Sequence, residues 1–547
     1  MKQLILKVHP KDNVLVALSD LAAGQEVSYR GKTYTLLEQI NAKHKFYEND
    51  MNTGDEVLMF GTLVGKVQYP VKAGSVMTTH NLKHAAAPYE YRPYNYEWHA
   101  PDISRFEGLT FNGYHRADGK VGTANYWLFI PMVFCENRNL DVIRETLHNE
   151  LGYAVTAKYR SYAHHLVEAF RNGVDISSLT APSSFEEMKK VRPFKNIDGI
   201  KFLNHQGGCG GTRQDSAVLS KLLAAYANHP NVAGITLLSL GCQNLQVHDF
   251  MADLKIRNPD FNKPLYIFEQ QQSKSEANLI AEAIRKTFEG LVEVNKIERL
   301  PAPLSKLTVG VKCGGSDGFS GISANPAVGY CSDLLVALGA TVLLAEFPEL
   351  CGAEQNIIDR TKDEAAARKF IKLMGAYGQA AINAGSGFDM NPSPGNIKDG
   401  LVTDAIKSNG AVKKGGTSPI VDVLDYTEPA TKPGLNLVCT PGNDVEATTG
   451  KTASGATLIL FTTGLGTPTG NPVCPVIKIA TNNALTKRMG DIIDINTGPI
   501  IEGEKSIEEM GEDILTYCIK AASGEVIPKA VLLNQDDFIP WKRGVSL

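Results

Sequence analysis

The segment LTVGVKCGGSDG, residues 307–318, places an apolar strand directly before a glycine-rich loop that carries a cysteine and an aspartate. An apolar strand that runs into a glycine-containing loop recurs at residues 201–211, 235–246, 435–449 and 458–470. Open α/β sheets bind ligands at the carboxyl ends of their strands, and glycine there lets the backbone approach a ligand closely. The sequence therefore predicts an α/β protein with one composite active site built from several such loops.

The chain is long enough for several domains, because its 547 residues exceed what one hydrophobic core usually holds. Residues 1–85 alternate short β-rich runs with turns and predict a small β domain. Residues 86–108 are rich in proline and tyrosine and predict a linker. We expect two α/β domains with mostly parallel sheets over residues 109–300 and 301–547, divided at a proline-containing segment near residue 300.

Composition narrows the class of function. A net charge of −4 and a charged fraction of 21% give no reason to expect a nucleic-acid or membrane partner. No apolar run reaches the length of a membrane span. The nine cysteines are scattered, unlike a disulfide framework, which favours a reducing cytoplasm. Residues 445–452 end like a phosphate-binding loop, but valine replaces its first glycine, which disfavours an ATP-dependent enzyme.

Histidine is confined to the first half of the chain, because all twelve histidines lie at or before His248. His44 and His80 stand out in the β domain, where each follows a strand or turn signal in a polar setting. One interpretation is a site for a metal or a substrate carboxylate, in which two histidines leave coordination positions open. The alternative is that both are ordinary surface histidines.

Thiols and carboxylates gather in the predicted glycine-rich loops. His205 and Cys209 share one loop, and Cys242 and Cys313 each end a strand. Three converging thiolates would suffice for an iron–sulfur cluster with one open iron. The alternative is that these thiols line a pocket or bind a single Fe²⁺. Asp317 fits a catalytic carboxylate and also a turn that uses the aspartate side chain.

Longer blocks of the sequence resemble the altronate/galactarate dehydratase family: residues 113–131, 240–244, 312–326, 346–355, 391–396, 441–449 and 461–470. Residues 1–85 resemble the SAF-type β-clip domain of that family. The resemblance implies a hydro-lyase that converts a sugar acid, D-altronate, to 2-dehydro-3-deoxy-D-gluconate and water, with Fe²⁺ as cofactor and Mn²⁺ as a substitute. Residues 204–216 depart from the pattern around their histidine and cysteine, which leaves galactarate or another aldonate as alternative substrates.

Such a dehydration removes the C2 proton and the C3 hydroxyl, and so needs a base, an acid and groups that stabilise an enediolate. We expect catalytic roles for His205, Cys209, Cys242, Cys313, Asp317 and Asn443, substrate contacts from Lys45, Asn81, Arg116 and Arg213, and metal ligation by His44 and His80. An iron–sulfur hydro-lyase and a non-catalytic sugar-acid sensor remain alternatives. The expected partners are a small sugar acid and a second copy of the chain in a homodimer.

Overall fold

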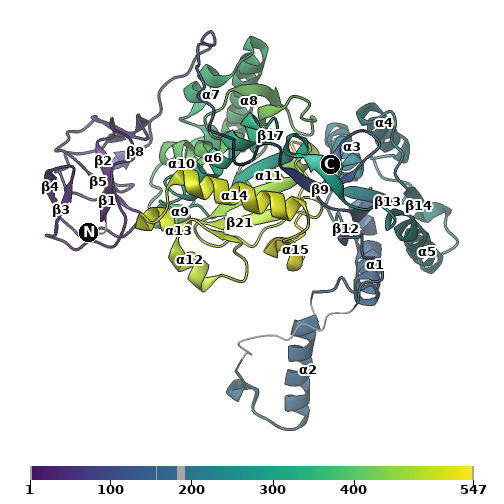
Figure 1. Ribbon diagram of the computed structural model, residues 1–547. Coiled ribbons are helices and arrows are strands. Elements are labelled where there is room, and N and C mark those ends of the chain that lie inside the picture. Colours follow the sequence, from purple (N-terminus) through teal and green to yellow (C-terminus); the bar gives the residue numbers. More distant parts are fainter. Residues whose placement is uncertain (1–2, 156, 181–190, 545–547) are drawn as a thin grey trace.

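The structure is a computed structural model that describes residues 3–155, 157–180 and 191–544. Its N-terminal domain is built from short antiparallel strands (Figure 1). Its strands are β1 (Ile5–Leu6), β2 (Val14–Ala17), β3 (Glu26–Tyr29), β4 (Lys32–Thr35), β5 (Lys45–Tyr47), β6 (Glu56–Met59), β7 (Thr62–Val67) and β8 (Leu82–Lys83). They form the sheets β1-β2-β5, β3-β4 and β6-β7-β8. Gly24, Gly54 and Gly74 have φ values of 75°, 91° and 84°, so the repeated turn before a strand depends on glycine.

The second domain contains a parallel four-stranded sheet in the order β12-β11-β13-β14. Its elements are β11 (Tyr126–Pro131), α1 (Asn137–Glu150), α2 (Ala157–Arg171), β12 (Gly199–Phe202), α3 (Arg213–Asn228), β13 (Val232–Ser239), α4 (Val247–Arg257), β14 (Leu265–Glu269) and α5 (Glu276–Val294). Tyr126 and Leu128 pack toward α3 and α4, whereas Trp127 and Phe129 pack toward α1 and α5. Both faces of β11 are therefore apolar, as a covered parallel sheet requires.

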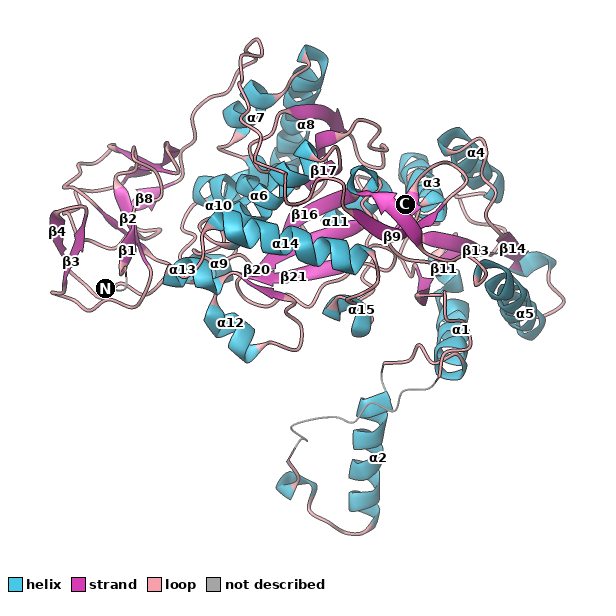
Figure 2. Cartoon of the chain, in the orientation of Figure 1, coloured by secondary structure: helices cyan, strands magenta, loops and turns pink. Residues whose placement is uncertain are grey.

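The C-terminal domain contains a parallel seven-stranded sheet in the order β18-β19-β17-β16-β20-β21-β22, with helices on both faces (Figure 2). Its strands are β16 (Thr308–Cys313), β17 (Thr341–Ala345), β18 (Ile420–Leu424), β19 (Gly434–Val438), β20 (Leu458–Thr463), β21 (Val476–Ala480) and β22 (Ile495–Asn496). Its helices are α6 (Ala324–Ala337), α7 (Glu354–Arg360), α8 (Glu364–Asn383), α9 (Pro394–Lys398), α10 (Asp404–Ala411), α11 (Asp444–Ala453), α12 (Asn483–Arg488), α13 (Gly498–Glu502), α14 (Ile507–Ala522) and α15 (Lys529–Leu532). The expected class, a small β domain followed by α/β domains with parallel sheets, is confirmed.

Two segments connect these bodies. A small antiparallel sheet, β10-β9-β15, joins the two α/β domains through β9 (Thr110–His115), β10 (Val121–Gly122) and β15 (Leu300–Pro303). The prolines of β15 are tolerated because this strand lies at the edge of its sheet. Residues 86–103 form no helix or strand, and the side chains of Tyr96 and Trp98 both donate hydrogen bonds to Thr417. None of the helices in the described ranges is both long and apolar enough to cross a membrane.

The N-terminal domain shares a hydrophobic core with the C-terminal domain. Val14, Tyr47 and Val57 belong to the same buried cluster as Phe319 and Leu401. Phe319 lies two residues after Asp317, and Leu401 lies two residues after Asp399. The shared core therefore holds the β domain against the polar loops that carry these two aspartates.

Candidate active site

Buried charged side chains meet at the carboxyl ends of β16 and β17. Lys312, the penultimate residue of strand β16, bonds to Glu346, which directly follows β17. Its Nζ also lies 2.9 Å from Asp444 Oδ1. The Glu346 carboxylate faces Lys414 at 3.0 Å and Lys451 at 3.6 Å. Glu346 has φ of 75°, a left-handed conformation that is costly for a non-glycine residue and is often found at functional sites.

A second carboxylate and a thiol complete this group. Glu349 Oε1 lies 3.0 Å from Lys407 Nζ, and its Oε2 lies 3.5 Å from the Cys313 Sγ. Lys414 Nζ donates to the same Sγ at 3.1 Å. We call this set of buried residues the lysine centre: Lys312, Cys313, Glu346, Glu349, Lys407, Lys414 and Lys451.

The charges of the lysine centre stabilise one another, because a buried charge is tolerated only when it is paired. Burial raises the pKa of Glu349, but Lys407 and its neighbours lower that pKa to about 2. Burial lowers the pKa of Lys407, yet the Glu349 carboxylate raises it above its ordinary value. Lys451 differs, because burial lowers its pKa to about 8 and its Nζ has no hydrogen-bond partner within the described chain. With four lysines and two glutamates, the lysine centre holds more ammonium groups than carboxylates.

Glycines let the loops approach this group. A Cβ on Gly314 would lie 2.4 Å from Asp444 Oδ2, and one on Gly464 would lie 2.2 Å from Asp317 Cγ. Asp317 is fully buried, and its Oδ2 accepts from Thr481 Oγ1 at 3.0 Å. The glycine-rich loops after β16 and β20 are thus packed directly against carboxylates.

Three consecutive residues of the N-terminal domain reach the same region. Lys43 Nζ lies 3.1 Å from Asp317 and 3.0 Å from Asp399. His44 Nε2 lies 3.1 Å from the Lys398 carbonyl, and Lys45 Nζ donates to the Gly400 carbonyl at 2.7 Å. Burial lowers the pKa of Lys45 to about 7, so much of this amine is neutral near physiological pH.

A small cavity joins this part of the β domain to the lysine centre. It is lined by Lys45, Ser316, Asn325 and Lys407 and has a volume of about 10 Å³. That volume is close to what one water molecule needs and is far smaller than a sugar acid. A sugar acid could therefore bind there only if the residues that line the cavity moved.

Several residues expected to bind substrate or catalyse make hydrogen bonds within the chain. Asn81 accepts from the Tyr47 hydroxyl at 3.0 Å and is buried within the β domain. Arg116 donates to the Pro230 carbonyl at 2.7 Å and joins loops of the second domain. Asn443 caps α11, where its Oδ1 accepts from two backbone amides. Arg213 and His80 are exposed.

The three thiols that were expected to converge lie on two different sheets. Cys313 belongs to β16 of the seven-stranded sheet, whereas Cys209 and Cys242 follow β12 and β13 of the four-stranded sheet. His205, near Cys209, bonds through Nε2 to the Pro131 carbonyl at 2.8 Å and through Nδ1 to the Gly207 amide at 3.0 Å. Burial lowers the pKa of His205 to about 4, so the ring is neutral and both nitrogens hold the loop.

The two histidines that were expected to bind a metal, and the carboxylates of the lysine centre, do not suit a single divalent ion. Among the described residues, no set of three close His, Cys, Asp or Glu ligand atoms includes His44 or His80. The ligand atoms of Cys313, Glu346 and Glu349 do lie within 4.8 Å of one another. However, lysines already neutralise both carboxylates, and a further cation there would face several ammonium groups.

Sequence reasoning missed most of the lysine centre. Glu349 reads as a solvated carboxylate, and the four lysines attract no attention among 55 lysines and arginines. One signal was present, because Lys312 interrupts an apolar strand that is buried on both sides. A charge in such a strand must have a buried partner.

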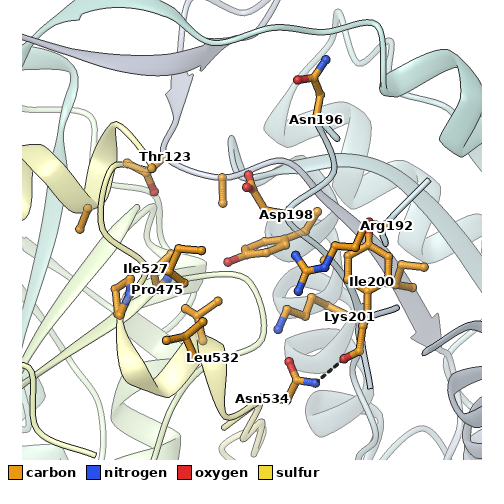
Figure 3. Close-up of a pocket in the computed structure, with 18 of the residues that line it drawn as sticks. Thr123, Arg192, Asn196, Asp198, Ile200, Lys201, Pro475, Ile527, Leu532 and Asn534 are labelled. Carbon is orange, nitrogen blue, oxygen red and sulfur yellow. Dashed lines mark hydrogen bonds between the residues drawn. The ribbon is translucent and has the colours of Figure 1, made fainter. Parts of the chain in front are cut away.

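A larger pocket lies elsewhere, between the second domain and the last third of the chain (Figure 3). Its volume is about 360 Å³, and Figure 3 shows Arg192, Asp198 and Lys201 along its wall. Lys201 pairs with Asp536 at 2.8 Å, and Arg299 pairs with Asp198 at 3.2 Å. Asp198 directly precedes β12, so this pocket lies at the amino ends of the strands, away from the glycine-rich loops.

Comparison with known proteins agrees with this architecture. Residues 3–85 match the altronate/galactarate dehydratase SAF domain, and residues 113–295 match the second domain of D-galactarate dehydratase/altronate hydrolase. Residues 304–546 match the C-terminal domain of D-galactarate/altronate dehydratase. The chain belongs to this dehydratase family. The expected enzyme class, a hydro-lyase, is thereby confirmed.

Full-length relatives in this family include enzymes with two different names. The altronate dehydratases of Escherichia coli K12 and Bacillus subtilis 168 are each 32% identical to this chain. These alignments cover 99% and 100% of this chain, and 99% and 100% of the respective relatives. The galactarate dehydratase (L-threo-forming) of Escherichia coli K12 is 31% identical over 95% of this chain and 93% of its own length.

Proposed function

We propose that this enzyme dehydrates D-altronate to 2-dehydro-3-deoxy-D-gluconate. Full-length similarity to two altronate dehydratases supports this substrate. The observation that carries the chemistry is the lysine centre, where four buried lysines surround two buried carboxylates. Preorganised positive charge of this kind suits both the substrate carboxylate and the enediolate that forms when the C2 proton leaves.

We choose two side chains with perturbed pKa values for the acid and base steps. We assign Lys45 as the base for the C2 proton, because its buried amine has a pKa of about 7 and borders the cavity shared with Lys407. Burial raises the pKa of Asp404, one helical turn before Lys407 on α10, to about 8. A carboxyl group that stays protonated at neutral pH can give its proton to the departing C3 hydroxyl. The resulting enol then tautomerises to the 2-oxo acid.

A substrate panel tests this function. We expect turnover of D-altronate to a 2-oxo acid, with kcat/KM at least about tenfold above that for galactarate and other aldonates, roughly 1.4 kcal/mol of discrimination. A preference for galactarate would replace the substrate and keep the reaction. Saturable binding without any turnover across the panel would instead support the sugar-acid sensor.

The pH profile tests the role of Lys45. Because the neutral amine is the base, kcat/KM should rise as pH increases through about 7 and fall as the amine becomes protonated below that value. Lys45→Met should lower kcat by at least about 100-fold and remove this limb. Lys72→Met, an exposed lysine of the same domain, is the matched control. If kcat/KM of Lys45→Met still rose with pH through about 7, Lys45 would not be the base.

We also propose, on the resemblance to the dehydratase family and not on a site seen in the structure, that activity requires Fe²⁺, with Mn²⁺ as a substitute. Anaerobic chelation should then inactivate the enzyme, and added Fe²⁺ should restore turnover. Elemental analysis must accompany the assay, because the described donors at His44 and in the lysine centre do not suit a divalent ion. Full activity in protein shown to be free of metal would refute the requirement.

Location and assembly complete the proposal. We place the enzyme in the cytoplasm, because all nine cysteines are free thiols. We expect a homodimer, which light scattering after size-exclusion chromatography would distinguish from a monomer.

A further inference from the structure

Only three of the nine cysteines are exposed: Cys135, Cys209 and Cys242. Cysteine is among the most buried residue types, so three exposed thiols call for an explanation. They follow β11, β12 and β13 respectively, which are adjacent strands of the four-stranded parallel sheet. The carboxyl ends of parallel strands meet at one edge, so the three thiols belong to one group of loops.

Backbone hydrogen bonds fasten these three loops together next to each cysteine. The Phe134 amide donates to the Gly207 carbonyl at 3.1 Å. The Asn244 and Leu245 amides donate to the Gly208 carbonyl at 2.9 Å and 3.3 Å. The loop that carries Cys209 thus lies between the other two and contacts both.

Gly208 and His205 hold the loop that carries Cys209 close to its neighbours. Gly208 has φ of 96°, and a Cβ there would lie 2.2 Å from the Met132 carbonyl oxygen. His205 braces the same loop through both ring nitrogens. A set of loops held this closely can present ligands in a fixed arrangement.

Two oxygen atoms of the residues directly after Cys135 add an independent observation. Glu136 Oε1 and Asn137 Oδ1 are buried and have no hydrogen-bond partner in the described chain. Buried polar atoms are nearly always paired, and those that are not are typical of places where the chain meets a water, an ion or a ligand.

We propose that Cys135, Cys209 and Cys242 bind an iron–sulfur cluster through three thiolates and leave one iron without a protein ligand. Thiolates select iron–sulfur clusters and other soft metals. Each thiol loses its proton to solvent when it binds its iron. The site replaces the expected triad that included Cys313, because Cys313 lies on the other sheet.

The three exposed thiols do not meet the spacing that a single ion requires. Two thiolates on one tetrahedral ion lie within roughly 4.6 Å of each other, twice the length of a metal–sulfur bond. Within the described residues, the only such set with all ligand atoms inside 4.8 Å is Cys313, Glu346 and Glu349. The three exposed thiols do not form such a set, so their arrangement does not fit one shared ion. Thiolates that bind different irons of a cluster lie farther apart, so a cluster is the form of iron that we propose.

The test measures the cluster itself, so its result does not depend on which sugar acid is the substrate. The full-length protein is purified without oxygen and reconstituted with ferrous iron and sulfide. We expect roughly four iron and four acid-labile sulfide atoms per chain, a brown visible absorption, and an EPR signal on reduction. Cys135→Ala, Cys209→Ala and Cys242→Ala should each lower iron and sulfide by at least about half.

Two further variants provide the controls. Cys351→Ala, a half-buried cysteine outside these loops, and Cys313→Ala should both retain iron and sulfide at the level of the unmodified protein. Circular dichroism of every variant shows whether the fold is kept. The proposal is overturned if iron binds without sulfide, if the three loop variants keep the cluster, or if Cys313→Ala loses it.

Discussion

Lys312→Met is expected to lower kcat by about 100- to 1,000-fold, the usual effect of removing one preorganised group that stabilises an oxyanion. Lys312 is fully buried and lies between Glu346 and Asp444 at the carboxyl end of β16. Methionine keeps most of the side-chain volume but removes the charge that we assign to the enediolate. Steady-state kinetics with D-altronate would measure the loss.

The matched control for this variant is Lys201→Met. Lys201 is also a buried lysine inside a parallel strand, but its strand belongs to the four-stranded sheet and its partner is Asp536. Its replacement should reduce stability while leaving kcat within about threefold. Equal losses of kcat in both variants would mean that Lys312 acts only through the fold, and an unchanged kcat in Lys312→Met would remove it from the reaction.

Glu346→Gln should lower the free energy of unfolding by about 3–5 kcal/mol, as expected when one partner of a buried ion pair is removed. The change leaves Lys312 and Lys414 without their shared carboxylate. Urea unfolding at neutral pH would measure this loss. Glu289→Gln, on an exposed helix face beside Arg285, should cost less than about 0.5 kcal/mol.

The pH dependence provides a second readout for Glu346. Burial raises the pKa of this carboxyl, but Lys312 and Lys414 lower it below its ordinary value of 4.5. The ionised group therefore contributes stability above pH 4.5, and that contribution is lost as pH falls through its lower pKa in the folded state. The difference between the unmodified protein and Glu346→Gln should shrink in acid over that interval. A difference that does not change with pH would argue against the ionised pairs.

Local patterns were enough to predict the order of domains and the class of each. The turns at Gly24, Gly54 and Gly74 appear in the sequence as repeated small-residue–glycine steps before valine. Apolar runs such as residues 307–313 are typical of parallel strands covered on both faces, which is how β16 is packed. These features depend on residues close together in the chain, so periodicity and turn chemistry are sufficient to reveal them.

The lysine centre could not be predicted in this way, because its partners are distant in sequence. Lys312 and Glu346 are 34 residues apart, and Cys313 and Lys414 are 101 residues apart. The sequence shows a lysine in an apolar strand, but its carboxylate partner depends on which strand lies beside it. His205 illustrates the same limit, because its position in a polar loop was evident while the backbone partners of its two nitrogens were not.

Which thiols share a site was also decided by tertiary structure. The sequence shows several cysteines after apolar strands, and on that evidence Cys313 is equivalent to Cys209 and Cys242. Strand order separates them, because β11 lies between β12 and β13 in one sheet while β16 lies at the centre of another. The sequence by itself determined which loops carry reactive side chains. Only the long-range pairing of strands decided which of those loops meet, since pairing depends on contacts that no local pattern records.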